Sequence, residues 1–322
     1  MEVNIYFNIQ IVLCHSTGHE DSNREMRAEE QQDFFTSAAD IINDVKESLS
    51  PSTISNYEVA LRSFEAYAGN NVTVDSISAD VLKGFERHLR KRNVSQNTSS
   101  CYMRSLRSLL TKMAGKEKCH LFDEVYTGKA NTQKRAITEQ QLSAIKHLQL
   151  QEGSYLCLAR DIFLFSYYAC GMPFVDIAFM RKDQIANGKL SYFRRKTGVG
   201  VSVTLEPCMT EIINRYKSDE RENVFPFITA NDEVQAYAQY LKALNHYNRT
   251  LKTLAKKAGI SQNLTAYVAR HSWASSAFAA NVDMPVISKA LGHTDSQTTK
   301  IYIKEINDDR LTEANREIID RI

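Results

Sequence analysis

Hydrophobic residues recur with the period of a helix along the first third of the chain. One apolar stripe, with spacings of three and four residues, is formed by Ile54, Tyr57, Leu61 and Phe64. It follows the helix-start signal Ser50-Pro51-Ser52-Thr53 and ends at Gly69-Asn70-Asn71. Similar patterns predict helices from Ser78 or Asp80 to Arg92 and from Thr98 to about Ala114. Together they predict a compact helical domain over residues 46–118.

The second half is also mainly helical, with one interruption. Residues 119–136 are polar and poorly periodic, which predicts a linker, and Thr138 with Gln141 forms a capping-box pattern that starts a second domain over 137–322. We expect helices at 138–149, 155–169, 174–181, 207–218, 235–258, 265–280, 283–291 and 296–303, and a charged tail helix near 308–319. Alternating residues from Leu190 to Arg195 and from Val201 to Leu205 flank a glycine-containing turn, which predicts a β-hairpin. The expected fold class is mainly α with a small antiparallel β-hairpin or sheet.

Length and composition agree with this organisation. A chain of 322 residues is long enough for about two domains, and 43% hydrophobic with 24% charged residues is typical of a globular protein. The low content of glycine (12 residues) and proline (5 residues) favours helices over turn-rich sheets. The longest apolar-leaning stretch, Val3 to Cys14, is broken by polar residues and too short to cross a membrane, so we expect no membrane partner.

The cysteines and histidines give no strong cofactor signal. The six cysteines contain no CxxC pair, which favours reduced thiols and a cytoplasmic location. Cys14, His15 and His19 lie close together, but Ser16-Thr17-Gly18 discourages the helix that would align the histidines, and a solvated terminal segment is the favoured alternative to a metal site. No GxxxxGK[ST] loop is present. We therefore expect neither a metal nor another cofactor.

Charge is distributed unevenly along the chain. Residues 1–45 carry nine acidic and two basic residues, and we expect this N-terminal segment to be loosely structured. Residues 83–118 carry ten basic and two acidic residues, an electrostatic pattern expected for a nucleic-acid partner. A solvated helix face is the alternative, although such a face normally alternates both signs. The candidate DNA-binding residues are Arg90, Lys91, Arg92, Arg104, Arg107 and Lys112.

Three short segments near the C-terminus have a spacing that points to chemistry. They are Ala269-Arg270-His271-Ser272-Trp273, Leu291-Gly292-His293 and Thr298-Thr299-Lys300-Ile301-Tyr302. Each alone is more typical of structural residues than of catalysis. Together, Arg270, the Leu291-Gly292-His293 turn and Tyr302 resemble the second catalytic box of the tyrosine recombinase (phage integrase) family.

Upstream segments extend the resemblance over roughly residues 46–306. Gly171-Met172 with Val175-Asp176-Ile177 is similar to the first box of the family, and Lys196 falls where the family carries its β-hairpin lysine. Residues 53–114 resemble the helical core-binding domain, including Thr98 and Tyr102. The resemblance implies a core-binding domain followed by a tyrosine-recombinase catalytic domain over 137–322.

The resemblance implies a role for each matched residue. Tyr302 is the expected nucleophile that forms a phosphotyrosyl ester, and Arg270 the clamp on the phosphate. Lys196 is the expected general acid for the leaving 5′ oxygen, and His293 a hydrogen-bond donor to a non-bridging oxygen. Asp176 matches an acidic position of the family and is expected to brace the site.

Two positions depart from the family pattern. The first arginine of the family falls on Pro173, which can donate nothing, and Tyr267 replaces the histidine or lysine three residues before Arg270. A tyrosine hydroxyl is a donor poorly suited as a base at neutral pH. Strand alternation places Arg194 on the same face as Lys196, so our hypothesis is that Arg194 supplies the missing charge; an ordinary exposed strand residue is the alternative.

The resemblance implies a site-specific DNA recombinase, integrase or invertase-like, that acts on double-stranded DNA. A homo-tetramer on paired sites is expected, with the tail helix docked on a neighbouring copy and DNA-bending accessory proteins as further partners. Both departures resemble the branch found on mobile and invertible elements of gut anaerobes. A non-catalytic DNA-binding relative is the alternative because of Pro173, and a type IB topoisomerase is a third hypothesis.

Overall fold

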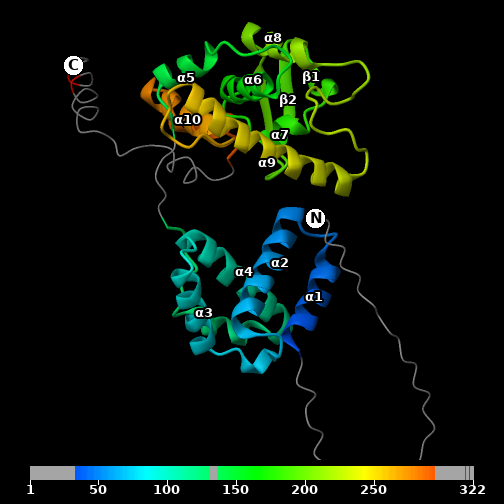
Figure 1. The fold of residues 1–322 in the computed structure, drawn as a ribbon, viewed down its shortest axis with the longest axis vertical. Coiled ribbons are helices and arrows are strands. Elements are labelled where there is room, and N and C mark those ends of the chain that lie inside the picture. The colour runs from blue at the N-terminus through cyan, green and yellow to red at the C-terminus, as the bar shows by residue number, and fades with distance from the viewer. Residues whose placement is uncertain (1–32, 131–135, 294–315, 317–318, 320–322) are drawn as a thin grey trace, which may run out of the picture. The chain divides into compact units, whose positions relative to one another are not determined.

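The structure is a computed structural model (Figure 1). In it the chain forms two compact units, Met1–Ala130 and Asn131–Ile322. The structure describes residues 33–130 and 136–293, together with 316 and 319. In the described part of the chain no helix has the length and apolar character that a membrane span requires.

The first unit is built from α-helices and two 3₁₀ segments. In chain order these are α1 (Phe34–Val45), α2 (Pro51–Ala68), η1 (Val74–Ser76), α3 (Ala79–Lys91), α4 (Gln96–Ala114) and η2 (Lys116–Phe122). The α-helices each begin at a side chain that accepts a hydrogen bond from the backbone N–H three residues on; these caps are Asp33, Ser50, Ser78 and Ser95. The helices predicted over 54–64, 78–92 and 98–114 are therefore confirmed, with α4 starting two residues early at its serine cap.

The first unit extends beyond residues 46–118 in both directions. Phe34, Ala38 and Ile42 are buried at a spacing of four residues along α1, so the expectation that 1–45 is loosely structured is wrong for 34–45. Residues 1–32 lie outside the described part of the chain. Beyond 118, η2 packs against the core through Phe122, and Val125 is also buried. The polar composition of 119–136 hid these two anchors.

The second unit combines α-helices with a small sheet. Its elements are α5 (Glu139–Lys146), α6 (Tyr155–Tyr168), α7 (Phe174–Ala178), η3 (Lys182–Gln184), β1 (Ile185–Ala186), β2 (Lys189–Phe193), β3 (Gly200–Thr204), α8 (Pro207–Tyr216), α9 (Glu233–Lys257), α10 (Val268–Ala279) and α11 (Met284–Ala290). The capping box of Thr138 and Gln141 is formed. The helices expected at 296–303 and 308–319 fall outside the described residues, apart from 316 and 319.

The sheet is antiparallel with the strand order β1-β2-β3. The hairpin predicted from residues 190–205 is confirmed, with Phe193 paired opposite Gly200. The first strand, β1, was missed, although Asn187 and Gly188 both have a positive φ and form the tight turn for which Asn-Gly is the strongest short signal. Leu190, Tyr192 and Val201 face the core, so one face of the sheet is buried and the other meets solvent.

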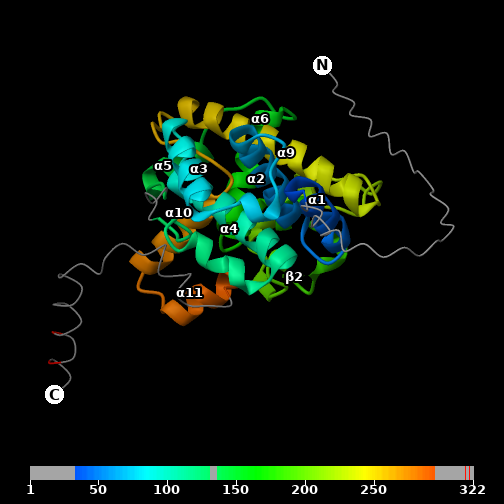
Figure 2. The ribbon, with the colours of Figure 1, turned by 90° about the horizontal axis from the view of Figure 1, so that it is seen from below.

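The core of the second unit is centred on α6. Ile162, Phe163 and Phe165 of this helix are fully buried and lie within the apolar cluster that includes residues of α9 and the sheet. A smaller apolar cluster joins α10 to α11 through Ala274, Ile287 and Leu291. Figure 2 shows α10 and α11 next to each other at one edge of this unit. The second cluster fixes the end of α11, where His293 follows.

A buried carboxylate ties α6 to α8. Asp161 accepts hydrogen bonds from Arg160 Nε at 2.9 Å, Arg215 Nη1 at 2.6 Å and the Tyr216 hydroxyl at 2.7 Å. We expect Asp161→Asn to lower the free energy of unfolding by about 2–3 kcal/mol, because it removes the charge that these donors share. Urea unfolding followed by circular dichroism checks this result. The control is Asp183→Asn on an exposed ion pair, and an equal effect of both substitutions would contradict the prediction.

Candidate active site

The C-terminal end of α11 fixes a turn that organises the site. Gly292 N–H donates to Lys289 O at 2.9 Å, and His293 N–H donates to Ser288 O at 3.0 Å. This pair of bonds is a Schellman motif, which needs a residue with positive φ at its turn, and Gly292 has φ +61°. The motif turns the carbonyl groups of Leu291 and Gly292 toward the side chains of Arg194 and Arg270.

Arg270 lies at the start of α10 and is 1% exposed. Its Nη1 donates to Gly171 O at 2.9 Å, and its Nη2 donates to Leu291 O at 2.6 Å. Gly171 has φ +74°, and a Cβ there would lie 2.9 Å from the Arg270 Cα, so only glycine permits this approach. The Gly171-Met172 motif read from the sequence is therefore a backbone clamp on Arg270.

Arg194 joins Arg270 at the same carbonyl group. It is 6% exposed, and its Nη1 donates to Leu291 O and Gly292 O at 2.9 Å each. The alternative that Arg194 is an ordinary exposed strand residue is therefore wrong. Because Leu291 O accepts from both arginines, the two guanidinium groups lie a few ångströms apart.

The two arginines are only partly neutralised by protein groups. The buried carboxylates of the described chain are Asp161 and Asp176, and Asp176 Oδ2 lies 3.8 Å from Arg194 Nε. Burial raises the pKa of Asp176, while the Arg195 N–H, which donates to it at 2.9 Å, and the two arginines oppose that shift. Burial and the neighbouring Arg270 lower the pKa of Arg194.

Unsatisfied donors mark the same cluster. Within the described residues, the Nε atoms of Arg194 and Arg270 are buried without a hydrogen-bond partner, as is Asp176 Oδ2. Buried donors without partners are costly, so a site of this kind favours an added acceptor. The cluster holds two guanidinium groups and one carboxylate, which lies against Arg194, so its net charge is positive and the acceptor that it favours is an anion.

His293 completes the cluster in a defined protonation state. Its Nε2 lies 2.9 Å from Arg270 Nη2, and since a guanidinium only donates, Nε2 accepts and the imidazole is neutral. Burial, with the nearby charges of Arg270, Arg194 and Lys196, lowers the pKa of His293 to about 4. For Nε2 to take the donor role implied by the resemblance, it must leave Arg270 and also carry a proton, through tautomer exchange or protonation, when an anion binds.

This pKa gives a prediction for the protein without DNA. We expect the His293 imidazole to titrate near pH 4 by NMR, well below the ordinary value of about 6.5. Because the folded pKa is the lower one, the unfolded chain binds more protons between those values, and stability falls as pH drops through this window. A bound DNA phosphate is expected to move the midpoint upward. A midpoint near 6.5 without DNA would contradict the prediction.

The remaining predicted residues differ in how closely they approach the cluster. Lys196 is exposed on the hairpin and close enough to lower the pKa of His293. Tyr267 is 46% exposed, with its ring 5.0 Å from that of His271. Pro173 begins α7, and its carbonyl accepts from Asp176 N–H at 2.9 Å. Tyr302 lies outside the described residues.

The candidate DNA-binding residues lie on α3, its C-cap and α4. Arg90, Lys91 and Arg92 are exposed at the end of α3. On α4, Arg104 and Lys112 are exposed and Arg107 is half-buried. No ion pair within the described residues uses any of these six side chains, whereas Lys83 and Lys118 are paired with carboxylates. The six are thus available to an external anion.

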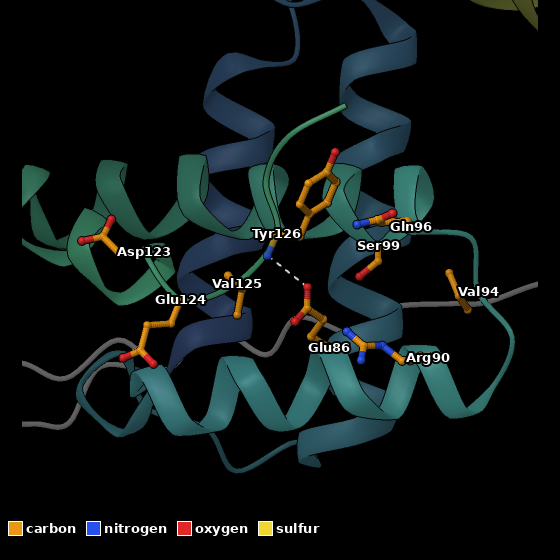
Figure 3. Close-up of a pocket in the computed structure, with 9 residues that line it drawn as sticks. All are labelled: Glu86, Arg90, Val94, Gln96, Ser99, Asp123, Glu124, Val125 and Tyr126. Carbon is orange, nitrogen blue, oxygen red and sulfur yellow. Dashed lines mark hydrogen bonds between the residues drawn. The ribbon is translucent and has the colours of Figure 1, made fainter. Parts of the chain in front are cut away.

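A pocket of about 610 Å³ lies beside these helices in the first unit (Figure 3). It is lined by Glu86, Arg90, Val94, Gln96, Ser99, Asp123, Glu124, Val125 and Tyr126. Figure 3 shows the Glu86 carboxylate accepting the Tyr126 N–H, at 3.0 Å. Three carboxylates against one guanidinium disfavour a phosphate in the pocket. The exposed arginines and lysines of α3 and α4 are therefore the better candidates for DNA contact.

Some contributors to the site were missed by sequence reasoning. The carbonyl groups of Gly171, Leu291 and Gly292 hold the arginines, and backbone acceptors leave no trace in residue type. The glycines at 171 and 292 were a usable signal, because both have a positive φ beside a buried arginine. Among the described residues, no group of three or more histidine, cysteine or carboxylate side chains forms a metal site.

Comparisons with known proteins give the family. Residues 135–308 match the phage integrase family, and residues 33–125 match the phage integrase SAM-like domain. The first match covers more than half of the chain, so the chain belongs to the phage integrase family. Among relatives, it is 24% identical to tyrosine recombinase XerC of Agrobacterium fabrum, over 79% of this chain and 84% of that protein.

Two solved structures share the fold. A lambda integrase tetramer bound to a Holliday junction superimposes with a TM-score of 0.65 and 14% identity, covering 90% of this chain and 83% of that one. The Tn1549 transposon integrase in complex with transposon right end DNA gives a TM-score of 0.65 and 13% identity, covering 90% and 99%. These similarities confirm the fold class: a helical N-terminal unit followed by a mainly helical catalytic domain with a small sheet.

Proposed function

We propose that this protein is a site-specific DNA recombinase that cuts and rejoins DNA through a 3′-phosphotyrosyl intermediate. The observation that carries the proposal is the pair of buried guanidinium groups, Arg194 and Arg270, which meet at one carbonyl group and whose Nε atoms make no hydrogen bond, although Arg194 Nε is 3.8 Å from Asp176 Oδ2. Membership in the phage integrase family and similarity to named tyrosine recombinases support it.

The proposed reaction needs neither a metal nor a nucleotide. The Tyr302 hydroxyl attacks the scissile phosphorus and gives its proton to solvent water, the bond from phosphorus to the 5′ oxygen breaks, and Lys196 gives a proton to that oxygen and regains one from solvent. Arg270 donates to the non-bridging oxygens, where negative charge accumulates. His293 adds a hydrogen bond once the phosphate competes for Arg270, and Tyr267, exposed at the start of α10, is proposed as a further donor. Rejoining reverses these steps with another 5′ hydroxyl.

Arg194 is proposed to replace the arginine that the family carries at the position of Pro173. Its burial beside Arg270 and its contact with the turn before His293 support this role. Asp176 is proposed to hold Arg194 and the hairpin backbone in place, through the Arg195 N–H. The Arg194 guanidinium would then reach the phosphate from the hairpin, whereas the arginine of the family would reach it from the position of Pro173, just before α7.

The assembly follows from the same proposal. We propose that double-stranded DNA binds both units, with Arg90, Lys91, Arg92, Arg104, Arg107 and Lys112 contacting phosphates. A homo-tetramer on paired sites is supported by the lambda integrase tetramer of the same fold. The same proposal has three further parts. The protein originates from a mobile or invertible element of gut anaerobes, residues 308–319 contact a neighbouring copy, and accessory proteins bend the DNA.

Trapping the covalent intermediate tests the function. The full-length protein is incubated with nicked DNA from the sequence flanking its gene, denatured and separated by gel electrophoresis. We expect a protein–DNA adduct, with the modified peptide mapped by mass spectrometry to Tyr302. Specific DNA binding without any adduct would favour a non-catalytic relative. Relaxation of supercoiled plasmids without a preferred site would favour a type IB topoisomerase.

A further inference from the structure

One side chain of α6 reaches the loop that holds Arg270. Ser166 lies in the last turn of this helix and is 3% exposed. A serine inside a helix ordinarily donates its hydroxyl to the carbonyl group four residues earlier, as Ser272 does to Val268 O at 2.8 Å. The Ser166 hydroxyl instead donates forward, to Met172 O at 2.7 Å. This hydroxyl therefore binds the loop that follows the helix and not the helix itself.

The backbone of Ser166 makes two more bonds to the same loop. Its carbonyl oxygen accepts from Gly171 N–H at 2.8 Å and from Met172 N–H at 3.1 Å. With the hydroxyl bond, Ser166 thus holds three consecutive peptide groups. The residue before them, Cys170, has φ +56°, a conformation that a residue with a side chain keeps only where its surroundings hold it. The bonds to Ser166 provide this support.

One of the three peptide groups is the acceptor for Arg270. The peptide group between Gly171 and Met172 carries both the carbonyl oxygen that accepts from Arg270 Nη1, at 2.9 Å, and the N–H that donates to Ser166 O. Because a trans peptide group is planar, its N–H and its carbonyl oxygen point in opposite directions from one rigid unit. Ser166 therefore binds one end of this unit and Arg270 binds the other.

We propose that Ser166 is a positioning residue for the recombination reaction: it orients the Gly171 carbonyl group, and through that group the guanidinium of Arg270. This inference rests on the proposed recombinase function. It also gives the first box of this chain a role that needs no side-chain cation. Pro173 donates nothing there, and the loop before it holds Arg270 through backbone groups that Ser166 fixes.

Removing the hydroxyl tests this role in the full-length protein. Ser166→Ala keeps a strong helix former in α6 and leaves the buried Met172 O without its donor. We expect the loop to shift and the adduct to form about tenfold more slowly in single-turnover reactions at saturating nicked DNA, with DNA affinity within about twofold of the parent. Ser166→Cys, a weaker donor of similar size, is expected to fall between the two.

Ser154→Ala is the matched control at the other end of the same helix. Ser154 caps α6 by accepting from Cys157 N–H at 3.2 Å, so its loss weakens the helix far from the loop. We expect both alanine variants to unfold at lower temperature, while Ser154→Ala keeps the parent adduct rate. If variants of equal thermal stability slowed the reaction equally, Ser166 would serve the fold alone and the proposal would be overturned.

A measurement without DNA shows whether the effect passes through Arg270. Burial and the charge of Arg270 lower the pKa of His293, whose Nε2 lies 2.9 Å from Arg270 Nη2. A displaced guanidinium weakens this repulsion, so we expect the His293 midpoint, followed by NMR, to rise in Ser166→Ala by about 0.5 or more on the pH scale. The midpoint is expected to stay unchanged in Ser154→Ala.

The two readouts separate the possible outcomes. An unchanged His293 midpoint in Ser166→Ala would overturn the proposal whatever the adduct rate, because the effect would not pass through Arg270. A shifted midpoint with the parent adduct rate would also overturn it, because the reaction would not depend on this position of the guanidinium. If the parent forms no adduct on any DNA, the recombinase function itself fails, while the midpoint still reports whether Ser166 holds Arg270.

Discussion

Replacing Arg194 with alanine is expected to slow formation of the covalent adduct by about 10²–10³-fold. Removing one preorganised donor from a site of developing negative charge typically costs that much. Arg194 is one of the two buried guanidinium groups that meet at Leu291 O, and the position that supplies the family's first arginine is a proline here. The rate is measured in single-turnover reactions on nicked DNA, with the adduct quantified on denaturing gels.

Arg195→Ala is the matched control for this prediction. Arg195 neighbours Arg194 in the hairpin, but its guanidinium stacks on Phe179 at the surface, and its contact with Asp176 uses the backbone N–H, which the substitution retains. We expect its adduct rate to remain within a few-fold of the parent. Thermal unfolding of both variants separates lost chemistry from lost structure. Arg194 would be assigned a structural role alone if its alanine variant cleaved at the parent rate while Arg270→Ala did not.

Local signals along the chain were sufficient to predict most of the elements. Serine caps before α2 and α3 and the capping box before α5 placed helix starts within a residue or two. These interactions join residues three apart, so their full information lies in a short window of sequence. Besides the short strand β1, α1 was missed, because its apolar stripe of three residues lies next to a long acidic segment.

The chemistry of the site was predicted less completely, because it depends on contacts between distant residues. Arg270 and His293 were identified as site residues from the resemblance of their motifs to the second catalytic box of the family, yet their direct contact and the neutral imidazole that it requires depend on the fold. The burial of Arg194 depends on the turn after α11, almost a hundred residues further along the chain. Strand alternation placed its side chain on one face and gave no information about what covers that face.

Substituting Gly292 with alanine is expected to slow adduct formation by about 10²-fold, because it moves Arg194. A Cβ at residue 292 would lie 2.5 Å from Arg194 Cδ and 2.9 Å from Val201 Cγ2. Neither distance is compatible with the present packing, so either the arginine or the turn must shift, and displacement of catalytic groups by about an ångström can cost this much in rate. The residue also has φ +61°, which adds about 1–2 kcal/mol of backbone strain for a residue with a side chain.

Gly259→Ala separates these two effects. Gly259 ends α9 in the same Schellman geometry, with φ +68°, its N–H donating to Lys256 O at 3.2 Å and that of Ile260 to Ala255 O at 2.9 Å. A Cβ there meets no atom within 4 Å, so the substitution introduces the strain without the clash. We expect Gly259→Ala to lose thermal stability through the strain alone and to keep the parent adduct rate, whereas Gly292→Ala loses at least as much stability and slows the reaction. If both slowed the reaction equally, backbone strain alone would explain Gly292→Ala, and the close approach of Gly292 to Arg194 would have no catalytic consequence.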